Sequence, residues 1–174
     1  YGVLYGIQTF LPHMHAHGEE GHVVTTASLA GLTRGNGTYG VSKHAVRALA
    51  ESLNVDLVTR GSKIGSSVLC PGFVNTNIGN AERNRPANMQ TSDAPDVDDE
   101  TFAPLVAMLK NGKDPSEVAD IVINAIKDKV FYILPHPAWD DTIREYFDEI
   151  LSRKELPPPG VPTFMTPRDD GEKY

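Results

Sequence analysis

A tyrosine and a lysine lie four residues apart in the stretch TYGVSKHAV, at Tyr39 and Lys43. In a helix this spacing places both side chains on one face, one turn apart. A free tyrosine has a pKa of about 10, too high for a base at neutral pH, but a nearby ammonium favours the phenolate and lowers that pKa. The pair therefore predicts a tyrosine that donates and accepts a proton.

Two further features follow apolar stretches that are typical of buried strands. Ser28 ends GHVVTTAS, and Pro71-Gly72 follows KIGSSVLC directly. In open α/β sheets, ligands bind beyond the carboxyl ends of the strands. We therefore expect Ser28 and the Pro71-Gly72 turn to lie beside the tyrosine–lysine pair.

The pattern of apolar residues predicts the elements that position these groups. Helices are expected over residues 1–17, 38–60, 114–129 and 140–153, and strands over 21–28, 63–70 and 130–136. This alternation predicts an α/β fold with a largely parallel sheet. Three strands make a thin sheet, and a parallel edge of this kind is normally covered by further strands and helices.

Two regions interrupt this pattern. Residues 76–112 mix Asn, Asp, Pro and Arg with one short apolar piece, which predicts a lid segment within a domain of residues 1–155. Its apolar side chains either wall a substrate pocket or pack the lid helix, and these are Phe73, Ile78, Phe102, Leu105 and Met108. Residues 156–174 read as an extended Pro-rich tail.

Composition narrows the function classes. The 174 residues carry a formal net charge of −7, which argues against nucleic-acid binding. The sequence lacks an apolar run of the roughly 20 residues that span a membrane. Cys70 is the one cysteine, so an internal disulfide is impossible, and we expect a reducing, cytoplasmic location. Because Cys70 lies within an apolar strand, we expect it to be buried.

A histidine-rich stretch, HMHAHGEEGH, invites a metal hypothesis. His13 and His17 have the i, i+4 spacing that can bind zinc. They lie at a helix end and in a polar loop, distant in topology from the tyrosine, so we interpret them as a solvated surface turn. We predict no metal site.

Taken together, three stretches resemble the C-terminal half of a short-chain dehydrogenase/reductase. These are TTASLAG, YGVSK and CPGFVNTNI, which hold a serine before a small-residue turn, Tyr-x-x-x-Lys, and Pro-Gly followed by a threonine. The resemblance covers about residues 1–155, and the order of the three motifs makes it far more specific than any one of them.

The resemblance implies an enzyme that transfers a hydride between a nicotinamide cofactor, NAD or NADP, and an alcohol or carbonyl substrate. It implies that Tyr39 is the general acid/base, that Lys43 lowers its pKa and holds the nicotinamide ribose, and that Ser28 binds the substrate oxygen. Cofactor contacts are implied for Tyr39, Lys43, Pro71, Gly72, Val74 and Thr76.

The sequence departs from the family pattern in two places. Ser28 and Tyr39 are eleven residues apart, about two fewer than the family suggests. A Gly-x-x-x-Gly-x-Gly turn is also missing, and the chain begins with Tyr1. We therefore expect a partial doubly wound, Rossmann-like sheet without its N-terminal dinucleotide-binding half, as in a fragment of a longer protein.

Two alternatives to the oxidoreductase remain. One is a truncated, non-catalytic Rossmann remnant or interaction module, and the other is an epimerase or dehydratase of the same superfamily. The resemblance also implies the partners. These are a small-molecule alcohol or carbonyl and further copies of the full-length protein in a homodimer or homotetramer, because helices 1–17 and 38–60 resemble those that pair between subunits in the family.

Overall fold

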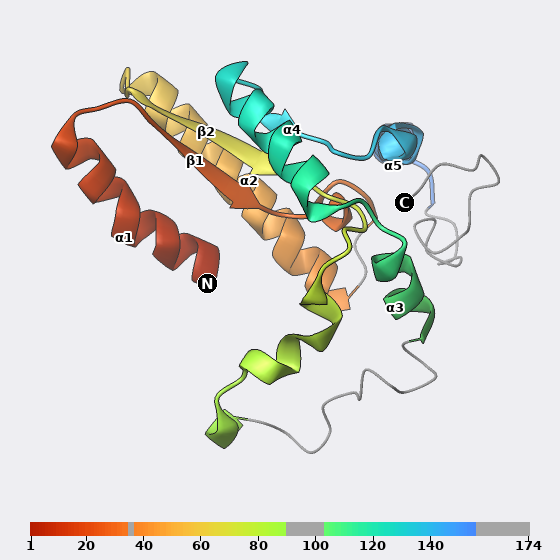
Figure 1. Cartoon of the computed structure of the whole chain (residues 1–174). Helices are drawn as coiled ribbons and strands as arrows, with labels where there is room; N and C mark the ends of the chain where they lie inside the picture. Colours follow the sequence, from red (N-terminus) through yellow and green to blue (C-terminus); the bar gives the residue numbers. More distant parts are fainter. Residues whose placement is uncertain (35–36, 90–102, 156–174) are drawn as a thin grey trace.

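The computed structural model describes residues 1–34, 37–89 and 103–155, so the predicted tail and the middle of the predicted lid lie outside the described residues (Figure 1). The α-helices and strands are α1 (Gly2–His17), β1 (Gly21–Thr26), α2 (Gly37–Thr59), β2 (Ile64–Leu69), α3 (Ala103–Lys110), α4 (Pro115–Lys127), β3 (Tyr132–Ile133) and α5 (Asp140–Ser152). Short 3-10 helices are η1 (Leu29–Gly31), η2 (Asn77–Asn84), η3 (Ala87–Met89) and η4 (Pro137–Trp139).

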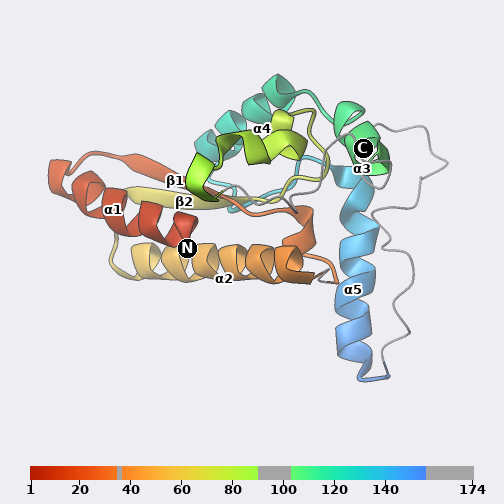
Figure 2. The ribbon, with the colours of Figure 1, turned by 90° about the horizontal axis from the view of Figure 1, so that it is seen from below.

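The three strands form a parallel sheet in the order β1-β2-β3. β1 and β2 pair along their whole length, from Gly21 opposite Ile64 to Thr26 opposite Leu69. Figure 2 shows α2 along one face of this sheet and α4 along the other. Helices on both faces of a parallel sheet are the doubly wound arrangement, so the predicted fold class is confirmed.

Local sequence signals account for where the helices begin and end. Gly18 and Gly61 adopt positive φ angles of 72° and 60°, which glycine does without steric cost, and they stop α1 and α2. Asp114 caps α4 by accepting the backbone N–H of Ser116 at 2.8 Å, with Pro115 at the first helical position. Each of these boundaries agrees with the sequence prediction to within about two residues.

The two clusters of buried apolar residues that form most of the core involve the sheet, α1 and α2. One cluster joins α2 to the carboxyl ends of β1 and β2, and a second lies at their amino ends, where α1 joins it. The buried members are Ala27, Leu32, Ala50, Val68 and Cys70 in the first, and Leu53, Leu57 and Ile64 in the second. The predicted burial of Cys70 is confirmed.

Among the described residues, β1 is an edge strand, because its one strand neighbour is β2. A groove of about 440 Å³ runs between α1 and β1. Apolar side chains such as Ile7 and Phe10 of α1 line one wall, and Val23 to Thr26 of β1 line the other. The groove ends at Thr26, which is also the carboxyl end of β1.

In the predicted lid region, the chain is more regular than the sequence suggests. The described parts form η2, η3 and the two-turn helix α3.

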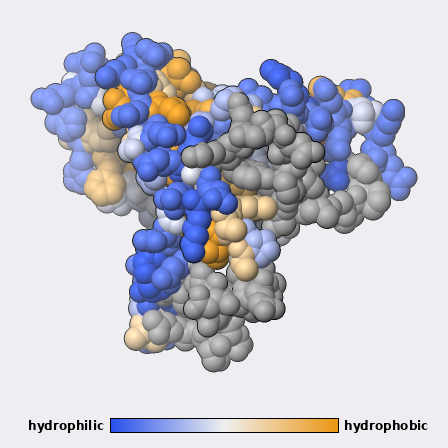
Figure 3. Space-filling model, turned by 45° about the vertical axis from the view of Figure 1, so that its right-hand side comes forward, coloured by the Kyte–Doolittle hydropathy of each residue, from blue (hydrophilic) through white to orange (hydrophobic). Residues whose placement is uncertain are grey.

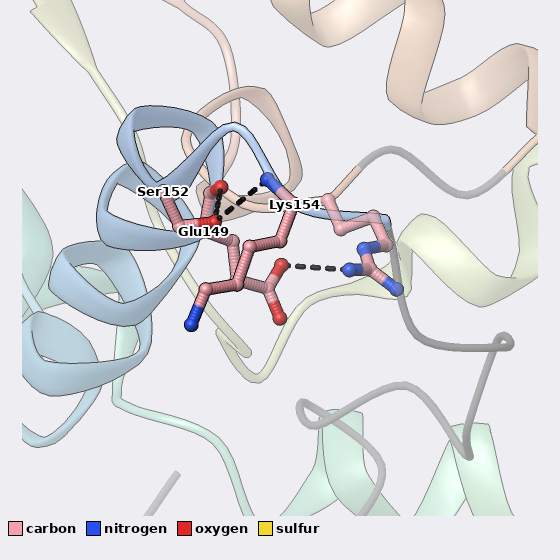
Figure 4. Close-up of polar contacts among 4 residues, drawn as sticks. Glu149, Ser152 and Lys154 are labelled. Atoms are coloured by element: carbon pink, nitrogen blue, oxygen red, sulfur yellow. Dashed lines mark hydrogen bonds and ion pairs between the residues drawn. The ribbon is translucent and has the colours of Figure 1, made fainter.

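Figure 3 shows a face on which hydrophilic side chains predominate, with smaller hydrophobic areas between them, in line with the charge of −7. Helix α5 is tied to the loop after η1 by an ion pair of 2.7 Å between Glu149 and Arg34, and Figure 4 shows Glu149 beside Ser152 and Lys154.

Candidate active site

The site is built where β1 and β2 end side by side. The ladder between them continues past the strands, because the N–H of Ala27 donates to Leu69 O at 2.8 Å and that of Leu29 donates to Pro71 O at 2.9 Å. The segment that follows β1 therefore runs beside the segment that follows β2. This pairing brings the serine turn next to the Pro71-Gly72 turn, as the sequence predicts.

Ser28 lies at this junction as the N-cap of η1. Its side-chain oxygen accepts the N–H of Ala30 at 3.2 Å and donates to Pro71 O at a long 3.5 Å. A Cβ on Gly31 would lie 2.8 Å from the carbonyl oxygen of Lys43. The small-residue turn thus lets η1 pack directly on the backbone of α2, which fixes Ser28 relative to that helix.

Tyr39 and Lys43 occupy the first turns of α2. The Lys43 Nζ lies 5.5 Å from the centroid of the Tyr39 ring, within the range of a cation–π contact. The same ammonium donates to the carbonyl oxygen of Thr26 at 3.4 Å. Lys43 therefore links the tyrosine to the carboxyl end of β1, while the Tyr39 side chain stays 51% exposed and accessible to a ligand.

The structure joins four of the predicted site residues in two pairs. Ser28 bonds to the Pro71 turn, and Lys43 contacts Tyr39. Among the described residues, no hydrogen bond joins the Ser28 hydroxyl to the Tyr39 phenol. Between the two, the contact of Gly31 with Lys43 is the packing link.

The predicted cofactor segment that follows Pro71 pairs with the chain between α3 and α4. Val74 forms an isolated parallel bridge with Lys113. The N–H of Lys113 donates to Phe73 O at 3.1 Å, and the N–H of Asn75 donates to Lys113 O at 2.9 Å. Val74 is thereby placed by hydrogen bonds on both sides of it.

Thr76 comes just after this pairing, directly before η2, and is exposed. Its hydroxyl oxygen accepts the N–H of Ile78 at 3.4 Å, a long bond. An exposed hydroxyl held so weakly can turn toward a ligand. The predicted role of Thr76 in cofactor binding stays a prediction.

His136 also lies where the strands end, beside the Pro71-Gly72 turn, and the sequence analysis missed it. It follows β3, and its ring is 6% exposed. Its Nδ1 accepts the N–H of Gly72 at 3.1 Å, and its Nε2 lies 2.9 Å from Phe73 O. Burial lowers the pKa of His136 below its ordinary value, and the charge of Lys113 lowers it further, while the bond to Phe73 opposes them.

Cys70 and the histidine-rich stretch are the remaining candidates from the sequence. Burial raises the pKa of the Cys70 thiol to about 11, so it is an unreactive thiol at neutral pH. His17 Nδ1 accepts the N–H of Glu19 at 3.3 Å at the end of α1. Within the described ranges, no group of three His, Cys, Asp or Glu side chains could hold a metal ion, and no helix is long and apolar enough to cross a membrane.

Comparison with known proteins places the chain in a family. The family model of the short chain dehydrogenases matches residues 1–87. The chain belongs to the short-chain dehydrogenase family. A C alpha-dehydrogenase from a Sphingobium species is 34% identical over 152 residues, which are 86% of this chain and 49% of that protein.

Other relatives agree with this assignment. A 1-deoxy-11-beta-hydroxypentalenate dehydrogenase from Streptomyces exfoliatus is 32% identical over 92% of this chain and 51% of that protein. A solved short chain dehydrogenase/reductase from Burkholderia phymatum, in complex with NAD, is 38% identical with a TM-score of 0.80, over 92% of this chain and 59% of that one. The chain spans about half the length of the curated relatives that it matches.

Proposed function

We propose that this chain is the catalytic portion of an oxidoreductase that uses NAD or NADP and acts on an alcohol or carbonyl group. The observation that carries the proposal is the placement of Lys43 over the half-exposed ring of Tyr39 at the carboxyl edge of the sheet. Membership of the short-chain dehydrogenase family supports it, as does the NAD in the Burkholderia phymatum neighbour.

The residues at this edge fit a nicotinamide dinucleotide. The ammonium of Lys43 and the phenol of Tyr39 suit ribose hydroxyls, which both donate and accept hydrogen bonds. The backbone around Gly72 and Val74 offers a rigid, uncharged surface for a flat ring, and the Thr76 hydroxyl suits a carboxamide. When bound, the cofactor supplies or accepts the hydride.

The chain's own residues then carry the proton chemistry. Tyr39 Oη gives a proton to a carbonyl oxygen, or takes one from an alcohol. The Lys43 ammonium, which lies over the Tyr39 ring, places a positive charge beside the group that handles the proton. The Ser28 hydroxyl donates to the substrate oxygen and stabilises the charge that develops there.

The test is turnover of an alcohol and carbonyl panel by the full-length protein, with Tyr39→Phe against wild type. We expect the kcat of the variant to fall by about 10² to 10⁴-fold, the usual range for a general acid/base, with cofactor binding retained. Tyr5→Phe, at another exposed tyrosine on α1, is the matched control and should keep wild-type activity. Activity of Tyr39→Phe within about threefold of wild type would reject Tyr39 as the acid/base.

We propose that the full-length protein forms a homodimer or homotetramer through α1 and α2. Exposed apolar side chains on these two helices support this, namely Phe10, Val41, Val55 and Val58. When a second copy covers side chains of this kind, apolar surface is removed from water and the free energy falls. Light scattering of the full-length protein gives the oligomeric state, and a monomer would reject the proposal.

A further inference from the structure

The ring of His136 is the contact between the end of β3 and the Pro71-Gly72 turn. It lies across the turn with one nitrogen on the N–H of Gly72, at 3.1 Å, and the other on the carbonyl of Phe73, at 2.9 Å. A Cβ on Gly72 would lie 3.2 Å from the ring Cγ and 3.3 Å from Cδ2. The ring therefore packs against the Cα of Gly72 as well as bonding to both neighbouring peptides.

The two bonds require one protonation state. A backbone N–H only donates, so Nδ1 of His136 must carry a free lone pair toward Gly72. A carbonyl only accepts, so Nε2 must carry the hydrogen toward Phe73. The neutral imidazole protonated at Nε2 meets both demands. The imidazolium instead points an N–H at the N–H of Gly72 and loses that bond.

A second element holds the same segment. The Phe73 carbonyl also accepts the N–H of Lys113, and a Cβ on Gly112 would lie 2.6 Å from that carbonyl group. The ring of His136 and the backbone of Gly112 and Lys113 therefore both restrain residues 72–74, although they are distant from this segment in sequence. Neither contact uses the side chains of Tyr39 or Lys43, so these restraints are independent of the proton chemistry.

We propose that His136 is a positioning residue, whose neutral ring holds residues 72–74 in the conformation that takes the nicotinamide end of the dinucleotide. The inference rests on the proposed function. Its role is to fix the shape of the backbone surface, without touching the reacting atoms. An acceptor and a donor on one rigid ring suit this task, since the ring sets both peptide planes at once.

The proposal implies a dependence on pH. Lys113 is the charged side chain whose field acts on His136, and burial and that charge both lower the pKa of the ring. At neutral pH the ring is therefore neutral, and its hydrogen bonds to Gly72 and Phe73 are both formed. As the pH falls through the lowered pKa, the ring gains a proton and releases Gly72.

The experiment compares binding of NAD⁺ or NADP⁺, whichever wild type binds, with binding of the matching ADP-ribose, which lacks the nicotinamide. The full-length protein is titrated by calorimetry as wild type, His136→Leu, His136→Gln and His136→Asn. Gln retains a donor at the position of Nε2, and Asn retains an acceptor at the position of Nδ1. His22→Leu is the matched control, because it removes another partly buried imidazole, bonded to Ser67 at 2.8 Å.

We expect His136→Leu to weaken binding of the dinucleotide by about tenfold, since it removes the acceptor of the Gly72 N–H and one of the two donors to Phe73 O, with ADP-ribose affinity unchanged. Gln and Asn should fall between Leu and wild type. The preference of wild type for the dinucleotide over ADP-ribose should decrease as the pH falls below 6.5 and through the lowered pKa of His136, and His136→Gln should show a flat profile. His22→Leu should bind both ligands as wild type does.

Each other outcome overturns the idea. If His136→Leu and both amide variants bind the dinucleotide like wild type, the positioning role is wrong and the proposed function stands. If ligand affinities fall equally for the dinucleotide and ADP-ribose, His136 supports the fold in general and not the nicotinamide surface. If wild type binds neither NAD⁺ nor NADP⁺, the proposed function fails and takes this inference with it. Should His136→Leu not fold, the Gln and Asn variants decide.

Discussion

Gly112 joins the predicted cofactor segment to the α3–α4 connection, and a single methyl group there tests how rigid that junction is. A Cβ at this position would lie 2.6 Å from both C and O of Phe73 and 2.8 Å from Val74 N. Ordinary contacts begin at about 3.4 Å, so Gly112→Ala creates an overlap of about 0.8 Å. The overlap is with backbone, which cannot rotate away as the end of a flexible side chain can.

The cost of this overlap follows from what must move to relieve it. Separating the two segments breaks the bonds from Lys113 N to Phe73 O, at 3.1 Å, and from Asn75 N to Lys113 O, at 2.9 Å. Each such bond contributes about 0.5 to 1.5 kcal/mol net. Overpacking adds about 1 to 3 kcal/mol. We therefore expect Gly112→Ala to lower the free energy of unfolding by about 2 to 6 kcal/mol.

The assay is urea unfolding of the full-length protein, followed by titration with NAD⁺ or NADP⁺. Gly2→Ala is the matched control, because a Cβ there meets nothing within 4 Å. That variant should change stability by less than about 0.5 kcal/mol. If Gly112→Ala costs less than about 1 kcal/mol and binds cofactor as wild type does, then the junction is compliant and the reasoning about it is wrong.

Two further predictions concern titratable groups that are buried or partly buried. Cys70 is 2% exposed and its thiol pKa is about 11, so the folded protein should resist alkylation at pH 8 and react only after unfolding in urea; rapid labelling of the folded state would contradict this. Burial lowers the pKa values of His22 and His136 below 6.5, so between the lowered values and 6.5 the unfolded chain binds more protons. The free energy of unfolding should therefore be greatest above pH 6.5 and fall as the pH drops below it. Urea midpoints at pH 7.5 and 5.5 measure this change, and a midpoint independent of pH would refute the argument.

The parts of the site that depend on local chemistry could be predicted from the sequence. The i, i+4 spacing of Tyr39 and Lys43 needs only a helix, and α2 provides it. Its boundary at Gly61 and the cap at Asp114 follow from backbone preferences of single residues. The pairing of Ser28 with the Pro71 turn follows from a parallel sheet, whose strand ends lie at one edge.

Two contacts between residues distant in sequence were missed. His136 lies 64 residues from Gly72, and its pattern, a histidine after a short apolar stretch, says nothing of which peptide it bonds. The general rule about strand ends could have indicated it, because it lies three residues after the end of β3. The close packing of Gly112 on Phe73 is equally invisible, since glycine is common in connections of every kind. The predicted strand 130–136 was too long: β3 spans Tyr132–Ile133, the residues that pair with β2.

These two sets of contacts differ in what they hold. Side chains perform the predicted chemistry at Tyr39, Lys43 and Ser28, whereas the surface proposed for the nicotinamide is backbone, whose shape other residues must fix. Residues 71–75 receive those restraints from three elements: η1 bonds Pro71 O, the ring after β3 bonds Gly72 and Phe73, and Lys113 bonds Phe73 and Asn75. A loop tied at nearly every residue holds one conformation before a ligand arrives, so less binding energy goes to ordering it. We therefore expect changes to these restraints to alter cofactor affinity, and changes to Tyr39 to alter the rate of the chemical step.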